Sequence, residues 1–122
     1  MMKSITFLLM AAVAMLMFVS CKKDNASSNI TITTTLPEGT ANASGEFILT
    51  GHISSAARLE KVWLTKEGQT TVFLADETTA KNKNEYDYSY LITGITVNTF
   101  MLIDVYDQNG TKITKRFLIK KL

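Results

Sequence analysis

Beyond residue 29 the chain is a series of short runs in which apolar and polar residues alternate. Residues 30–35 are all β-branched, and the run stops at Leu36-Pro37-Glu38-Gly39, where proline and glycine indicate a turn. In residues 47–53 every second position is apolar or glycine, and the positions between are mostly polar. This period of two is typical of a half-buried β-strand.

Five further runs complete the pattern, at residues 59–65, 70–75, 86–92, 99–106 and 111–122. The first two flank the turn-forming residues 66–69, which predicts a hairpin. The last two flank Asp107-Gln108-Asn109-Gly110, in which Asn-Gly predicts a tight hairpin because both residues tolerate positive φ. The polar stretch 76–85 predicts an exposed loop.

Seven strands at regular spacing, with no helical period among them, predict an all-β domain. We expect a single antiparallel β-sandwich of seven strands over residues 30–122, and a β-barrel of similar length is the alternative. The closing sequence TFMLIDVYDQNGTKITKRFLI resembles the small Ig-like and fibronectin-like domains found in many surface lipoproteins. The resemblance implies an Ig-like fold, but not the antibody subtype, because the chain has a single cysteine and so no disulfide of its own.

The two most apolar strands carry the first candidate contact residues. Val62 and Leu64 share one face of their strand, so burying them turns Trp63 to solvent. Burying Trp63 instead fits equally well, since a tryptophan in this strand is a usual core residue of Ig-like folds. Residues 99–106 are apolar on both faces, so Phe100 and Leu102 either form a contact surface or, as we favour, are covered by neighbouring side chains.

A row of tyrosines is the second candidate surface. Tyr86, Tyr88 and Tyr90 lie on one face of their strand and could stack on sugar rings, together with Trp63 if the strands were adjacent. The favoured interpretation is that their rings pack at the rim of the core while their hydroxyls reach water.

The first part of the chain has a different character. Lys3 precedes an apolar stretch, residues 5–19, whose one polar member is Thr6, and this is typical of a secretory signal peptide. The stretch is short for a membrane span, which needs roughly 20 apolar residues. Phe18-Val19-Ser20-Cys21 resembles the lipobox of bacterial lipoproteins, although leucine is commoner at the position of Phe18. The resemblance implies cleavage between Ser20 and Cys21 and acylation of Cys21.

The sequence therefore predicts three parts: a signal peptide (1–20), a lipidated flexible tether (21–29) and an Ig-like β-sandwich domain (30–122). Two or three acyl chains on Cys21 would hold the protein on membrane lipid permanently. We expect a lipid-anchored protein of the cell envelope, with the outer membrane favoured. Lys22-Lys23-Asp24 weakly resembles the export signals of Bacteroidota-type lipoproteins, and contact of both lysines with lipid head groups explains it equally well.

Chemistry-bearing residues are scarce. The formal net charge is +2 and basic residues are scattered, so nucleic acid is not an expected partner. His52, the one histidine, is expected to be an ordinary surface residue. Asp76-Glu77 could join Asp104 or Asp107 around calcium, but the spacing matches no calcium loop and a turn explains it better. No metal site, no cofactor and no catalytic residues are predicted.

These observations favour a non-catalytic binding or structural-interaction module, whose partner is membrane lipid through Cys21 and a protein or glycan ligand at the cell surface. A carbohydrate-binding accessory lipoprotein that uses exposed aromatic residues is the alternative.

Overall fold

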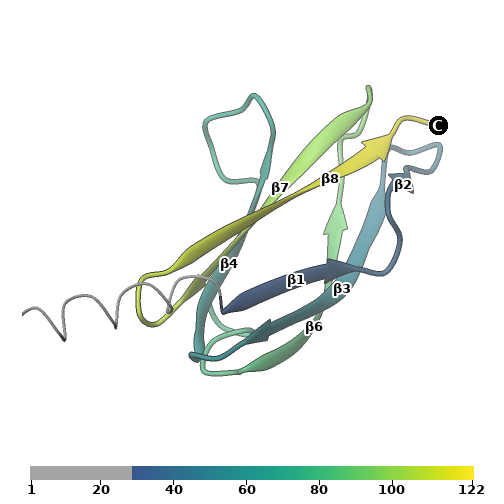
Figure 1. Ribbon diagram of the computed structural model, residues 1–122. Coiled ribbons are helices and arrows are strands. Elements are labelled where there is room, and N and C mark those ends of the chain that lie inside the picture. The colour runs from purple at the N-terminus through teal and green to yellow at the C-terminus, as the bar shows by residue number, and fades with distance from the viewer. Residues whose placement is uncertain (1–28) are drawn as a thin grey trace, which may run out of the picture.

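The computed structural model describes residues 29–122, and the predicted signal peptide and all but the last residue of the predicted tether lie outside this range. The described part is built only from strands (Figure 1). There are eight: β1 (Ile30–Thr34), β2 (Gly39–Thr40), β3 (Phe47–Ser55), β4 (Leu59–Lys66), β5 (Leu74–Asp76), β6 (Glu85–Ile92), β7 (Thr99–Asp107) and β8 (Lys112–Lys120).

The strands form two sheets that face each other across one core. One sheet has three strands in the order β1-β3-β6, and the other has five in the order β2-β8-β7-β4-β5. Figure 1 shows β3 between β1 and β6 in one layer, with the long β7-β8 hairpin in the other. The predicted all-β sandwich is confirmed.

Two details of the prediction are wrong. The strand count is eight rather than seven, and the pairing is not wholly antiparallel, because β2 runs parallel to β8, with Gly39 beside Ile119 and Thr40 beside Lys120. A strand of two residues is too short to show any period in the sequence. Gly39 is suited to this place because a side chain there would overlap the ring of Phe47.

Both predicted hairpins exist, but their geometry differs from the prediction. In the first, only Leu74–Asp76 pairs with β4, so the strand predicted at 70–75 is shorter and later. In the second, Gly110 has a φ of 88° while Asn109 keeps negative φ. The carboxylate of Asp107 accepts hydrogen bonds from the backbone N–H groups of Asn109 and Thr111, at 2.9 Å each. Asp107 therefore organises the turn, and only the glycine adopts the left-handed conformation.

The inward faces of the two sheets form the core. β4 and β7 contribute side chains with no exposed surface, and the three-stranded sheet adds large apolar and aromatic ones. The apolar residues buried to 98% or more are Ala41, Leu49, Ile53, Leu59, Val62, Leu64, Ala80, Tyr88, Ile92, Met101, Ile103, Val105, Phe117 and Ile119. Among the described residues every core residue lies within 30–119, so the two sheets share one core. No helix within residues 29–122 is long and apolar enough to cross a membrane.

Candidate binding surfaces

The outer face of the five-stranded sheet carries an aromatic pair. Val62 and Leu64 are fully buried, so the alternation of β4 places Trp63 outward, where it is half-buried. Trp63 meets the ring of Tyr106 on β7 edge to face, with 5.5 Å between ring centroids. Of the two predicted orientations of Trp63, the structure has the outward one. We call Lys61, Trp63, Tyr106 and Lys112 the aromatic face.

Two lysines lie over these rings. The Lys61 ammonium is 4.0 Å from the Trp63 ring centroid and 4.7 Å from that of Tyr106, and Lys112 lies 5.8 Å from the Tyr106 centroid on the β8 side. Both are cation–π contacts, which contribute about 0.5–1 kcal/mol at exposed sites. Within residues 29–122 neither lysine makes an ion pair. The aromatic face therefore offers two positive charges beside apolar rings.

Acidic groups complete this surface. The Trp63 indole N–H donates to a carboxylate oxygen of Glu77 at 2.8 Å. Asp104, which lies opposite Trp63 in the register, accepts a hydrogen bond from the Thr114 hydroxyl at 2.6 Å. Charged donors and acceptors thus surround the two rings, an arrangement found in polar binding sites with an aromatic centre.

Phe100 and Leu102 lie further along the same face of β7, and both are half-buried. The Arg116 guanidinium covers the Phe100 ring, with its central carbon 3.5 Å from the ring centroid. Arg116 also makes a two-pronged ion pair with Glu67, at 2.8 and 3.0 Å. Its hydrogen bonds lower the pKa of Glu67 and raise that of Arg116. The favoured prediction, that neighbouring side chains cover Phe100, agrees with this geometry.

The tyrosine row faces the core, not solvent. Tyr88 is 2% and Tyr90 is 7% exposed, and their rings stack at 5.6 Å, while Tyr86 is half-buried. The Tyr88 hydroxyl donates to the backbone carbonyl of Thr33 at 2.7 Å. Burial raises the pKa of Tyr88 to about 12. These rings belong to the other sheet from Trp63, so a joint tyrosine and tryptophan platform for sugars is wrong, and so is the prediction that the buried hydroxyls reach water.

A buried carboxylate, Asp76, receives the remaining tyrosine hydroxyls. Asp76 is 7% exposed and accepts hydrogen bonds from the Tyr90 hydroxyl at 2.7 Å, the Thr79 N–H at 2.9 Å and the Thr78 N–H at 3.2 Å. The Thr79 hydroxyl also donates to it, and the Tyr86 hydroxyl lies 3.4 Å away. Burial raises the pKa of Asp76, but these donors outweigh burial and hold it below its ordinary value.

The Asp76 network joins the two sheets, because Asp76 ends β5 and the tyrosines belong to β6. It also raises the pKa of Tyr90 strongly, through burial and through the adjacent carboxylate. Sequence reasoning assigned Asp76 to an exposed loop. The sequence contains one relevant signal: Asp76 directly follows an apolar run, and a later strand carries three tyrosines on one face.

His52 is held between two carboxylates on the outer face of the three-stranded sheet. Its Nδ1 lies 2.6 Å from Asp87 and its Nε2 lies 2.6 Å from Glu85, and the Ser54 hydroxyl also donates to Glu85. Only the doubly protonated ring can donate to both carboxylates. The hydrogen bonds to Asp87 and Glu85 accordingly raise the pKa of His52, and His52 lowers that of Glu85. The expectation of an ordinary surface histidine missed this bridge, which depends on the β3–β6 register.

The four acids considered for calcium are not brought together. Asp76 is enclosed by its donors, Glu77 and Asp104 face the aromatic face, and Asp107 caps the β7–β8 turn. Within residues 29–122 no group of three or more histidine, cysteine or acidic side chains has a metal-binding arrangement.

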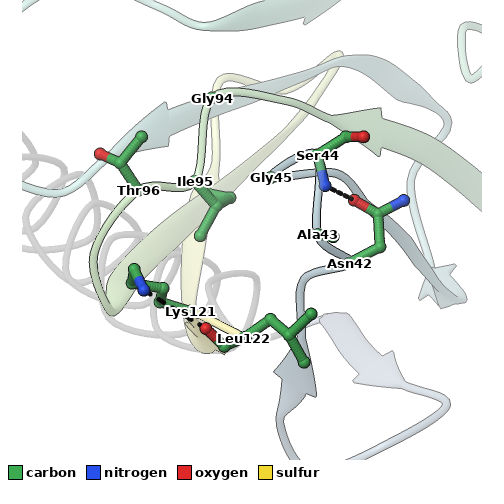
Figure 2. Close-up of a pocket in the computed structure, with 9 residues that line it drawn as sticks. All are labelled: Asn42, Ala43, Ser44, Gly45, Gly94, Ile95, Thr96, Lys121 and Leu122. Atoms are coloured by element: carbon green, nitrogen blue, oxygen red, sulfur yellow. Dashed lines mark hydrogen bonds between the residues drawn. The ribbon is translucent and has the colours of Figure 1, made fainter.

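A depression of about 380 Å³ lies between the loops that follow β2 and β6 and the last residues of the chain (Figure 2). It is lined by Asn42, Ala43, Ser44, Gly45, Gly94, Ile95, Thr96, Lys121 and Leu122. Backbone contacts form much of it, including the Ile95 N–H bond to the Gly45 carbonyl at 3.0 Å. Its one ionisable side chain is Lys121, so the depression offers no general acid–base pair and no nucleophile with an adjacent base.

Comparisons with known proteins address the fold alone. No family model matches the chain, and no curated protein matches it significantly. A solved structure of fibronectin(III)-like modules of CbhA from Clostridium thermocellum is similar, with a TM-score of 0.56 and 15% sequence identity over 75% of this chain and 93% of that one. The described domain has a fibronectin(III)-like β-sandwich fold.

Proposed function

We propose that this protein is a non-catalytic, lipid-anchored module of a bacterial cell envelope, held through acylated Cys21, that binds a partner through its aromatic face. The fibronectin(III)-like fold is consistent with a binding or structural domain. The lipobox-like Phe18-Val19-Ser20-Cys21 supports the anchor, and the polar tether supports a domain that stands off the membrane.

One observation carries the binding role. Trp63 and Tyr106 lie together on an outer sheet face, beside two lysines that have no ion-pair partner among the described residues. Tryptophan and tyrosine are enriched at the centres of protein interfaces, and charged side chains are usual at the polar rim around them. A protein partner that inserts acidic groups beside Lys61 and Lys112, and packs on the two rings, fits this surface.

Carbohydrate binding is the second candidate, because charged donors and acceptors that could bind sugar hydroxyls lie around the rings of Trp63 and Tyr106. The Lys61 ammonium lies over the Trp63 ring, so a sugar could stack on that side only after displacing it. This cost, and the loss of the tyrosine row as a platform, make a protein partner the better-supported choice.

The anchor is tested by intact mass and membrane fractionation of the full chain beside Cys21→Ala. We expect the native protein to lack residues 1–20, to carry acyl mass and to sediment with membranes, and the variant to be neither lipidated nor retained. Retention of the leader in both forms would refute the anchor.

The aromatic face is tested by placing a photo-crosslinking amino acid at Tyr106 in cells and comparing Trp63→Ala and Lys61→Glu with Thr31→Ala, which lies on the other sheet. We expect one cross-linked protein that is lost in the first two variants and kept in the third. Binding to a glycan array that disappears in Trp63→Ala would support the carbohydrate alternative instead.

A further inference from the structure

We propose that the free edge of β6 docks an extended, basic segment of a partner polypeptide, which adds to the three-stranded sheet as a fourth strand. This goes beyond the proposed function, because it uses the other sheet and a different mode of contact. Figure 1 shows β6 at the border of its layer, with β3 on its inner side.

The backbone register shows which groups β6 offers. The Thr35 N–H donates to the Thr50 carbonyl, so the backbone of Thr50 faces β1 and that of its neighbour Gly51 faces β6. Gly51 lies opposite Tyr88, and backbone groups alternate sides along a strand. The N–H and C=O groups of Asp87, Ser89 and Leu91 therefore point away from β3, and no backbone partner exists for them within residues 29–122.

This edge is long, and it carries acidic side chains alone as charged groups. β6 has eight residues, whereas the two edge strands of the other sheet, β2 and β5, have two and three. Proteins usually blunt such edges with charged side chains, especially lysine, or with proline or a bulge; the charges of β6 are the acidic Glu85 and Asp87, which repel a like-charged strand but attract a basic one. β6 contains neither lysine nor proline, and its register with β3 is unbroken. An edge of this kind can accept an added strand.

The charges beside the edge select a basic partner. Glu85 and Asp87 are both strongly exposed, and the one cation between them is His52. β1, the strand on the other side of β3, places only the hydroxyl side chains of Thr31 and Thr33 beside Ser54 and His52. Two carboxylates against one imidazolium leave an excess of negative charge. A second copy of the chain would bring the same excess to the seam, so self-pairing through β6 is disfavoured and lysine or arginine is favoured.

The far end of the edge is apolar. Leu91 is 51% and Ile48 is 58% exposed, and the two lie opposite each other in the β3–β6 register. With Phe47 they form the apolar side of a shallow depression of about 310 Å³, whose other side is lined by Thr40, Asn42 and Glu46. An added antiparallel strand would therefore place an apolar side chain opposite Leu91, a small one opposite Ser89 and basic ones opposite Asp87 and Glu85.

The test uses the full chain in detergent micelles, and the capped peptide Val-Thr-Thr-Val-Lys-Thr-Lys as probe. The first, third, fifth and seventh residues of the peptide are an apolar valine, a small threonine and two basic lysines, which would lie opposite Leu91, Ser89, Asp87 and Glu85 in that order. Amide shifts from ¹⁵N NMR and anisotropy of the labelled peptide report binding. We expect the largest shifts at the amides of Asp87, Ser89 and Leu91. Ser89→Pro removes an outward N–H while leaving the β3–β6 bonds, and should weaken binding about tenfold or more.

A peptide with glutamate in place of both lysines should also bind about tenfold or more weakly, since it meets the two carboxylates. Trp63→Ala should bind as the native chain does, which separates this site from the aromatic face. The proposal is overturned if the folded Ser89→Pro variant binds equally well, if the largest shifts lie elsewhere, or if the chain without peptide sediments as a β6-dependent dimer.

Discussion

The hydrogen bond from Tyr90 to Asp76 should be a major source of stability for this sandwich. Tyr90→Phe deletes only the hydroxyl, which is 2.7 Å from the carboxylate in a site where both residues are buried. A hydrogen bond to a charged group contributes about 1.5–3 kcal/mol. Asp76 keeps its bonds from Thr78 and Thr79, so no unpaired charge is left and we expect a loss within this range.

The loss converts to a shift in melting temperature. For a domain of 60–100 residues each kcal/mol corresponds to about 4–8 °C, so Tyr90→Phe should lower Tm by about 6–24 °C. Asp76→Ala should cost more, about 3–5 kcal/mol, because it leaves the Tyr90 hydroxyl and the Thr78 and Thr79 N–H groups without their acceptor. Urea denaturation followed by circular dichroism gives the free energy of unfolding for each variant.

Tyr86→Phe is the matched control. It removes the same hydroxyl from the same face of β6, but Tyr86 is half-buried and its oxygen lies 3.4 Å from Asp76, too long for a strong bond. Its short hydrogen bond, at 2.8 Å, is with the uncharged hydroxyl of Thr79. We expect a loss below about 1 kcal/mol. If Tyr90→Phe cost no more than Tyr86→Phe, the reasoning that the buried network supports the fold would be refuted.

Three further predictions follow from single contacts. Hydrogen bonds to Asp87 and Glu85 raise the pKa of His52 in the folded state, so its contribution to the free energy of unfolding is complete below about pH 6.5 and is lost as pH rises through the folded pKa. Tm should therefore fall with rising pH in that window, and His52→Gln should make Tm less dependent on pH. Gly51→Ala should destabilise by about 2–4 kcal/mol in urea titrations, since its methyl group would overlap the Thr33 carbonyl and the Tyr88 hydroxyl. Asp107→Ala should cost about 1–2 kcal/mol by removing two backbone hydrogen bonds of the β7–β8 turn, and an unchanged Tm would contradict this.

The alternation of residues was sufficient to predict the layers of the fold. Val62 and Leu64 are apolar at a spacing of two, and both are fully buried, because a pleated strand sends every second side chain to the core. The same argument placed Met101, Ile103 and Val105 together, and all three are buried. The alternation of apolar residues predicts burial here because the pleat of a single strand decides which of its side chains share a face.

Contacts that depend on the register between distant strands could not be predicted. His52 meets Glu85 and Asp87 only because β3 and β6 pair with Ile53 opposite Tyr86, and a shift by one residue would turn these side chains to the other face. Asp76 is buried because its side chain, at the end of the short β5, reaches the tyrosines of the other sheet. Asp76 and Tyr90 are 14 residues apart, and no local sequence pattern predicts that they meet. The parallel pairing of β2 is likewise fixed by a partner at the far end of the chain.

The groups that stabilise the fold and the surfaces proposed for recognition lie in different parts of this molecule, and this makes the proposed function testable. The buried network of Asp76 and the apolar core support the fold from inside, without help from a disulfide. Trp63 is half-buried on the outer face of its sheet and the outward groups of β6 lie at an exposed edge, so neither belongs to the buried core. Variants of the aromatic face and of the β6 edge should therefore remain folded, so a loss of binding in either can be attributed to the contact removed and not to unfolding.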